Sequence, residues 1–100
     1  MTKRSIDIPK ERIADFCRRH HIRKLSLFGS VLRDDFGPES DIDVLVEFEP
    51  GHVPGLGLIT IEDELSELLG YPVDLVIAKS VIPPLRARIL AEAQVQYAKK

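Results

Sequence analysis

The alternating segment Ile42–Phe48 most strongly limits what this chain can fold into. Successive side chains of a strand point to opposite faces, so a regular apolar alternation predicts a strand with one face in a core. The residues predicted to face that core are Ile42, Val44, Val46 and Phe48. Those predicted to face the other side are Asp41, Asp43, Leu45 and Glu47. Asp41 and Asp43 therefore share a face, with their side-chain bases about 6–7 Å apart.

Helix and strand patterns alternate along the rest of the chain. Apolar residues at helical spacing predict helices over residues 9–20, 58–69 and 83–93, and Ser30 is predicted to cap a short helix over 31–35. Apolar runs predict further strands over 22–28, 73–77 and 95–97, and the Pro- and Gly-rich residues 49–57 predict a mobile loop. Amphipathic helices need an apolar surface to cover, so we expect an α/β (α+β) fold, a small sheet with helices packed on it. A length of 100 residues fits one domain over residues 1–100.

Composition excludes several classes of partner and site. With 14 basic and 16 acidic residues the formal net charge is −2, so no sequence-wide basic surface is present and no direct nucleic-acid partner is expected. The single cysteine, Cys17, excludes an internal disulfide and a multi-cysteine metal site, and its helical spacing predicts burial. No signal-peptide pattern and no apolar run near the ~20 residues of a membrane span are present, so we expect a cytoplasmic protein without a membrane partner.

Three carboxylates are candidates for a metal site. Asp41 and Asp43 can converge on one hard cation, and Mg²⁺ is typically held by one or two carboxylates together with substrate phosphates. Asp74 interrupts the apolar run Val73–Ile77, where an unpartnered carboxylate would cost several kcal/mol. If that strand lies beside Ile42–Phe48, Asp74 shares the face of the other two aspartates. One or two divalent cations would then relieve the repulsion among three carboxylates.

The residues Gly29, Ser30 and Arg33 are candidates for binding phosphate. Gly29 allows a close approach of the backbone, Ser30 offers a hydroxyl beside free N–H groups, and Arg33 brings a fork of donors. Together with the aspartates they indicate a site for a metal-bound nucleoside triphosphate. A Gly-Ser turn and a Ser-Asp-x-Asp strand start also occur for purely structural reasons. The order of strand, turn, short helix and strand, with a later aspartate in a strand, favours the functional interpretation.

Other residues allow weaker interpretations. His20, His21 and His52 show no paired spacing with cysteines or acids, so we expect them to be solvent-facing or hydrogen-bonded rather than metal ligands. Glu47 lies about 13 Å along the strand from Asp43, too far to join the aspartates. The apolar, stiff segment Val81–Leu85 is predicted to be a covered core edge, with a partner-binding edge as the alternative.

The segments Leu27–Ser30 and Ser40–Val46, with Arg33, resemble the minimal nucleotidyltransferase family of the DNA polymerase beta superfamily. The segment Leu69–Val76 is similar to that family's third-carboxylate strand, so the resemblance covers nearly the whole chain. It implies a mixed sheet, Asp41, Asp43 and Asp74 as a catalytic metal-binding triad, and Gly29 with Ser30 as the triphosphate-binding turn. Val31 and Leu32 depart from the family, because many members carry a polar or basic residue there.

Members of this size often resemble the antitoxin of a toxin–antitoxin pair whose partner is a HEPN-domain ribonuclease. The resemblance implies Mg²⁺-dependent transfer of AMP from ATP to a tyrosine of that toxin. A non-catalytic antitoxin that inhibits by complex formation is the alternative. Nucleotide transfer to a small molecule is less favoured, because the chain is too short to carry a separate acceptor domain.

Overall fold

The structure is a computed structural model that describes residues 8–32, 37 and 40–99. Its elements in chain order are α1 (Lys10–Arg19), β1 (Ile22–Phe28), η1 (Gly29–Leu32), β2 (Ile42–Phe48), η2 (Gly55–Gly57), α2 (Leu58–Leu69), β3 (Val73–Ile77), η3 (Ala78–Ser80), α3 (Pro83–Glu92) and β4 (Gln94–Ala98). The first three strands and the helix α2 match the sequence predictions residue for residue. The fourth strand is two residues longer than predicted. In the described part of the chain no helix is long and apolar enough to cross a membrane.

The four strands form one mixed sheet in the order β3-β2-β1-β4. β2 and β3 run parallel and are connected through α2, whereas β1 is antiparallel to both β2 and β4. A parallel pair requires such a crossover connection, which the helix supplies. The expected fold class, a small mixed sheet with packed helices, is confirmed.

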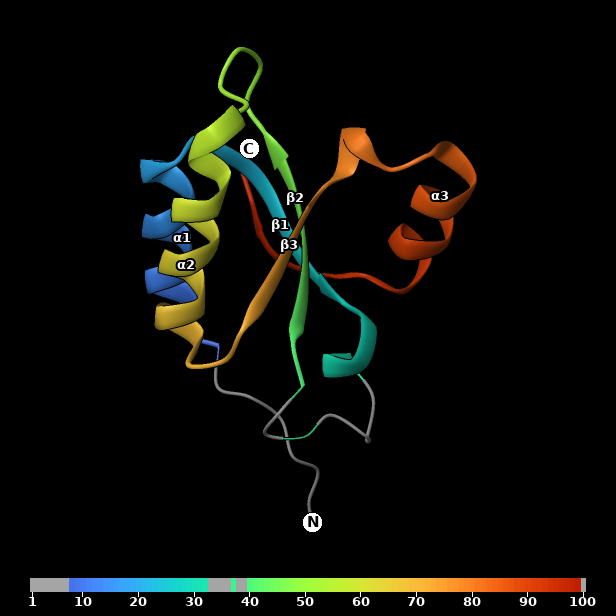
Figure 1. The fold of residues 1–100 in the computed structure, drawn as a ribbon, viewed down its shortest axis with the longest axis horizontal. Coiled ribbons are helices and arrows are strands. Elements are labelled where there is room, and N and C mark those ends of the chain that lie inside the picture. Colours follow the sequence, from blue (N-terminus) through green and yellow to red (C-terminus); the bar gives the residue numbers. More distant parts are fainter. Residues whose placement is uncertain (1–7, 33–36, 38–39, 100) are drawn as a thin grey trace.

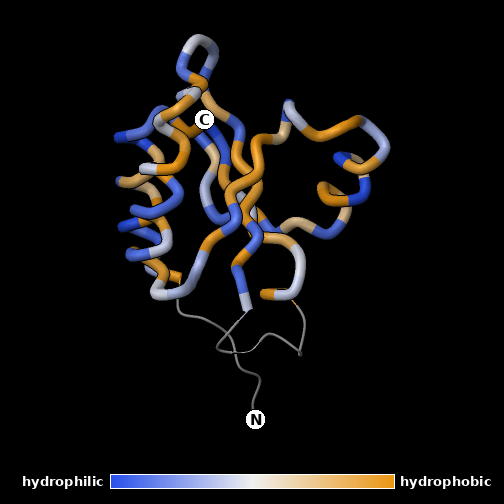
Figure 2. The backbone as a smooth tube through the Cα atoms, viewed as in Figure 1, coloured by the Kyte–Doolittle hydropathy of each residue, from blue (hydrophilic) through white to orange (hydrophobic). Residues whose placement is uncertain are grey.

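The core lies between the sheet and two helices. Figure 1 shows α1 and α2 together on one face of the sheet, with α3 on the opposite side. The helices bury Ile13, Phe16, Cys17, Ile61, Leu65 and Leu69 against the face of β2 that carries Ile42, Val44, Val46 and Phe48. In Figure 2 orange stretches of the strands are interrupted by blue positions, and blue residues alternate with orange ones along both helices. The alternation of β2 thus places its polar positions on the α3 side.

A small ionic cluster joins α1 to α2 at the molecular surface. Arg19 Nη2 lies 2.7 Å from Glu64 Oε2, and His20 Nε2 lies 2.8 Å from Glu64 Oε1. The hydrogen bond from Arg19 lowers the pKa of Glu64, and His20 adds to that effect. His20 therefore has a structural partner, as expected from the sequence.

The helix α3 differs from its prediction. Its apolar residues are expected from their spacing to form one stripe that continues to Ala93 and packs on the sheet, but α3 ends at Glu92 and buries none of its residues. Leu85 and Leu90 remain 45% and 42% exposed. Its neighbour Ile82 is 65% exposed, so the prediction of a covered core edge at Val81–Leu85 is wrong.

Hydrogen bonds from one arginine attach α3 to the segment that precedes it. Arg86 Nε donates to the carbonyl oxygen of Ala78 at 2.9 Å, and its Nη2 donates to that of Val81 at 3.1 Å. Polar contacts with η3 and the following turn therefore hold this helix in place of an apolar interface.

Cys17 is predicted to be chemically inert in the folded protein. Its side chain is fully buried, and this burial raises the pKa of the thiol to about 12. Since the thiolate is the nucleophile, iodoacetamide at mildly alkaline pH is expected to leave the native protein unmodified and to alkylate it fully after denaturation. Mass spectrometry of both samples checks this. Alkylation of the native protein at the rate of the denatured one would contradict the described packing of α1.

Candidate active site

Two of the three predicted aspartates lie side by side on neighbouring strands. In the parallel pairing of β2 with β3, Asp43 is the partner of Asp74. Paired residues on adjacent strands point to the same face, and neighbouring strands lie about 4.8 Å apart. Asp43 is half-buried and Asp74 is exposed. The register thus places both carboxylates on the side of the sheet that carries α3.

Asp41 lies immediately before β2 and is exposed. The next residue, Ile42, donates its backbone N–H to the carbonyl oxygen of Pro72 at 2.8 Å, which ties the start of β2 to the start of β3. All three aspartates therefore belong to the same end of this strand pair. Carboxylate oxygens are the ligands that Mg²⁺ prefers.

The glycine of the Gly-Ser turn packs directly against Asp43. Gly29 follows β1 with a φ of +80°, a left-handed conformation that side chains rarely adopt. A β-carbon built there would overlap Asp43 Oδ2 and would lie 3.1 Å from Asp43 Cγ. Phe28 is the strand partner of Asp43, so the register of β1 and β2 brings the turn to the carboxylate. Only glycine combines this backbone angle with this close approach.

The backbone N–H of Gly29 already donates to an anionic oxygen. Its acceptor is Glu92 Oε2, at 3.2 Å, from the last residue of α3. This N–H therefore points toward a position that a carboxylate oxygen occupies. An anionic phosphate oxygen can accept the same hydrogen bond. Figure 1 shows η1 close to the lower end of the sheet, where β2 begins.

The short helix predicted over residues 31–35 lies only partly within the described residues. Within them, Gly29–Leu32 form a 3₁₀ turn that already includes Ser30, so the prediction that Ser30 caps a helix beginning at residue 31 is wrong. Ser30 is half-buried in that turn. The predicted phosphate ligand Arg33 lies outside the described residues.

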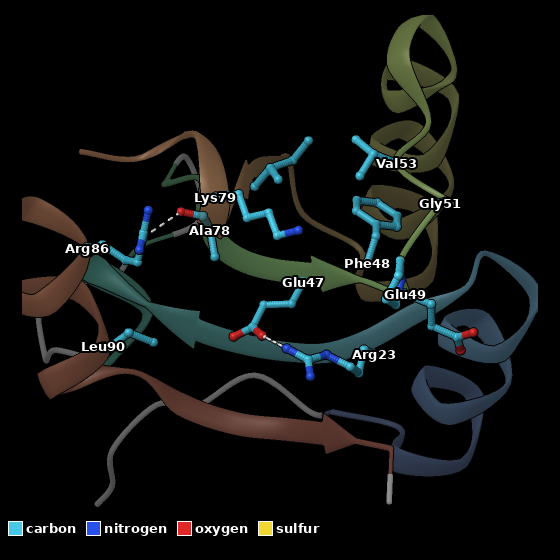
Figure 3. Close-up of a pocket in the computed structure, with 12 residues that line it drawn as sticks. Arg23, Glu47, Phe48, Glu49, Gly51, Val53, Ala78, Lys79, Arg86 and Leu90 are labelled. Atoms are coloured by element: carbon cyan, nitrogen blue, oxygen red, sulfur yellow. Dashed lines mark hydrogen bonds and ion pairs between the residues drawn. The ribbon is translucent and has the colours of Figure 1, made fainter. Parts of the chain in front are cut away.

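A cavity of about 430 Å³ lies at the other end of β2, between the sheet, the β2–α2 loop and α3. Figure 3 shows Glu47 paired with Arg23 at this cavity, while Arg86 extends toward Ala78. The carboxylate of Glu47 is engaged in the ion pair with Arg23. This agrees with the expectation that Glu47 does not join the aspartates. The cavity is separate from the aspartates.

The structure brings together two histidines that no sequence pattern connects. His21, Glu49 and His52 have ligand atoms that all lie within 4.8 Å of one another. Residues 21 and 52 are far apart in sequence, and the antiparallel pairing of β1 with β2 joins them. Both histidines are exposed, as expected, but the structure also places them with Glu49 in one group of potential ligands, which the lack of paired spacing did not predict. The spacing of Glu49 and His52, three residues apart, is the one local signal.

A family model described as "Nucleotidyltransferase domain" matches residues 10–96, nearly the whole described chain. The chain belongs to this nucleotidyltransferase family. The resemblance seen in the sequence is thus confirmed, and the protein is an enzyme of this class.

Two sequence relatives are similar to this nucleotidyltransferase over most of their length. One is the provisionally named protein adenylyltransferase MJ0435 of Methanocaldococcus jannaschii, 40% identical over 84% of this chain and 89% of its own. The other is the protein adenylyltransferase MntA of Thermococcus cleftensis, 37% identical over 74% of each chain.

Solved structures share the fold. A provisionally named minimal nucleotidyltransferase is 36% identical, with a TM-score of 0.73 over 85% of this chain and 86% of its own. A chain from the complex of a tri-AMPylated Shewanella oneidensis HEPN toxin with an MNT antitoxin has a TM-score of 0.67, covering 90% of this chain and 70% of that one. At 21% identity the second likeness concerns the fold alone.

Proposed function

We propose that this nucleotidyltransferase transfers AMP from ATP to a tyrosine hydroxyl of a cognate HEPN-domain ribonuclease toxin and thereby acts as its antitoxin. The observation that carries the proposal is the pairing of Asp43 with Asp74 beside Gly29, which combines a carboxylate pair with an anion-accepting turn. The names of the similar adenylyltransferases support a protein acceptor. The antitoxin role is supported by the similar fold found in an MNT–HEPN complex. We also propose that the protein acts in the cytoplasm and that residues 1–100 form one domain.

Asp41, Asp43 and Asp74 would hold one or two Mg²⁺ ions. The residues fit this ion, because they offer only oxygen atoms at one end of a strand pair. When bound, Mg²⁺ supplies charge neutralisation for the triphosphate.

Gly29 and Ser30 are proposed to bind the phosphates. The Gly29 N–H would donate to a phosphate oxygen in place of Glu92, and the Ser30 hydroxyl would donate to another. Arg33 is retained as a proposed third donor. Because phosphoryl transfer depends mainly on positioning and charge, these contacts would align the α-phosphate with the acceptor.

Asp74 is proposed to accept the proton of the attacking hydroxyl. It lies on the edge strand β3 and is exposed, so a hydroxyl presented by a partner protein can reach it. The acceptor oxygen forms a bond to the α-phosphorus, and the bond from this phosphorus to the oxygen bridging toward the β-phosphate breaks. Pyrophosphate leaves with the electron pair, and the hydroxyl proton passes to the Asp74 carboxylate.

Replacing Glu92 by Gln is expected to tighten nucleotide binding. The Glu92 carboxylate accepts the hydrogen bond from the Gly29 N–H, which the triphosphate would need for its own binding. The negative charge of Glu92 also repels the phosphates. Removing this charge should lower the Kd for ATP by about 2- to 10-fold, the effect of one modest charge interaction. Calorimetric titration of ATP into both proteins measures the change. Glu67→Gln, on the exposed face of α2, is the matched control, and weaker ATP binding by Glu92→Gln would contradict this arrangement.

The proposed reaction can be tested with labelled nucleotide. Purified protein, MgCl₂ and the proposed HEPN partner are incubated with ATP labelled at either the α- or the γ-phosphate. The proposal predicts that only the α-label enters the HEPN protein, and that a modified tyrosine carries the mass of AMP. Transfer of the γ-label, or modification of a small molecule instead, would overturn it.

A further inference from the structure

The strongest unassigned cluster in the described chain lies at the end of β2 opposite the aspartates. His21 follows α1, Glu49 directly follows β2, and His52 lies in the β2–α2 loop. Each offers one ligand atom, and the three atoms all lie within 4.8 Å of one another. Glu49 is six residues from Asp43 along β2, about 20 Å away, so the cluster is separate from the proposed active site.

Backbone hydrogen bonds hold the three residues in place. The N–H of Glu49 donates to the carbonyl oxygen of His21 at 2.8 Å, and the N–H of His52 donates to that of Glu49 at 3.0 Å. His21 has a φ of +59°, a left-handed conformation that is uncommon outside glycine. This conformation accompanies stacking of the two imidazole rings, with centroids 3.9 Å apart and planes inclined by 18°.

The donor atoms of the cluster suit a cation. Glu49 Oε2 lies 3.0 Å from Lys99 Nζ, and the same carboxylate offers an oxygen within 4.8 Å of both histidine ligand atoms. The cluster thus combines one carboxylate with two imidazoles. Two nitrogen ligands with one carboxylate oxygen form a donor set typical of zinc sites that keep a fourth position for water or another ligand.

We propose a binding site for a divalent transition-metal ion such as Zn²⁺, formed by His21, Glu49 and His52. This site is independent of the Mg²⁺ site proposed at the aspartates. Imidazole ligands favour Zn²⁺, Ni²⁺ or Cu²⁺ over Mg²⁺, which takes oxygen ligands. The bound ion would fasten the turn between α1 and β1 to the β2–α2 loop. Glu49 and Gly51 also line the cavity of Figure 3, so the ion would stiffen one wall of that cavity.

Zinc titration calorimetry of the tag-free full chain tests this site. The Asp41→Asn/Asp43→Asn double variant is used as background, so that binding to those two aspartates cannot contribute. The proposal predicts one equivalent of Zn²⁺ and a rise in the melting temperature. Adding His52→Ala should weaken binding at least about 10-fold and remove the rise, since loss of a direct ligand costs no less than loss of its supporting partner.

Two further variants make the result specific. His21→Asn introduces a residue that tolerates the left-handed backbone at this position. This variant should also bind Zn²⁺ at least about 10-fold more weakly. His20→Gln changes the adjacent histidine, which is bonded to Glu64 rather than to the cluster, and should bind zinc normally. Circular dichroism confirms that each variant is folded. Absence of zinc binding, or binding unchanged by both His21→Asn and His52→Ala, would overturn the proposal and leave the stacked rings as loop packing.

Discussion

Replacing Asp43 by Asn is expected to reduce AMP transfer at least about 100-fold, because the change removes a charge that acts where the transferred phosphate gathers negative charge. Asn keeps the shape of the side chain, so its packing against Gly29 is retained. Asp43 is central to the site, since it pairs with Asp74 and contacts the turn. Initial rates with α-labelled ATP and the HEPN protein, measured at saturating MgCl₂, give the effect.

The control for this result is Asp63→Asn, on the exposed face of α2. It makes the same change of charge on the opposite side of the sheet and should retain full activity (Figure 1). If Asp43→Asn transferred AMP at the rate of this control, the aspartate pair would not be the reaction centre.

Replacing Gly29 by Ala is expected to lower both the stability of the protein and its rate of AMP transfer. The added β-carbon would overlap Asp43 Oδ2 and would place an ordinary side chain at a φ of +80°. The left-handed conformation alone costs about 1–2 kcal/mol. Displacing the carboxylate by even 1 Å can cost about 100-fold in rate. We therefore expect a lower free energy of unfolding together with a rate loss of about 100-fold.

A second glycine separates these two contributions. Gly51 has a φ of +81°, but a β-carbon added there would meet no atom of the described residues within 4 Å. Gly51→Ala should lower the free energy of unfolding by a similar amount and leave AMP transfer intact. Chemical denaturation and initial rates of both variants make the comparison. Equal activity in Gly29→Ala and Gly51→Ala would contradict a close contact between the turn and Asp43.

Local patterns were sufficient to predict the strands and the aspartate group. The alternation of Ile42–Phe48 identified β2, and an aspartate within the apolar run Val73–Ile77 identified the candidate neighbour of Asp43. The residue-to-residue pairing of Asp43 with Asp74 depends on strand register, which no local pattern contains. The structure supplied that register, and with it the contact between Gly29 and Asp43.

Two features could not be predicted, because they depend on tertiary contacts. The apolar residues of α3 repeat at helical spacing, yet polar bonds from Arg86 hold the helix and leave Leu85 and Leu90 substantially exposed. The cluster of His21, Glu49 and His52 forms only where two connecting segments meet at one end of the sheet. Pairing of β1 with β2 creates that proximity.

We propose that this protein silences its HEPN partner by catalysis rather than by binding. The most direct measurement is the ribonuclease activity of the HEPN protein after incubation with catalytic amounts of this protein, MgCl₂ and ATP, followed by removal of ATP. We expect that wild-type protein abolishes the activity only when ATP was present, and that Asp43→Asn protein leaves it intact. Equal inhibition by Asp43→Asn protein, or inhibition that requires stoichiometric amounts and no ATP, would contradict this claim and identify a binding antitoxin.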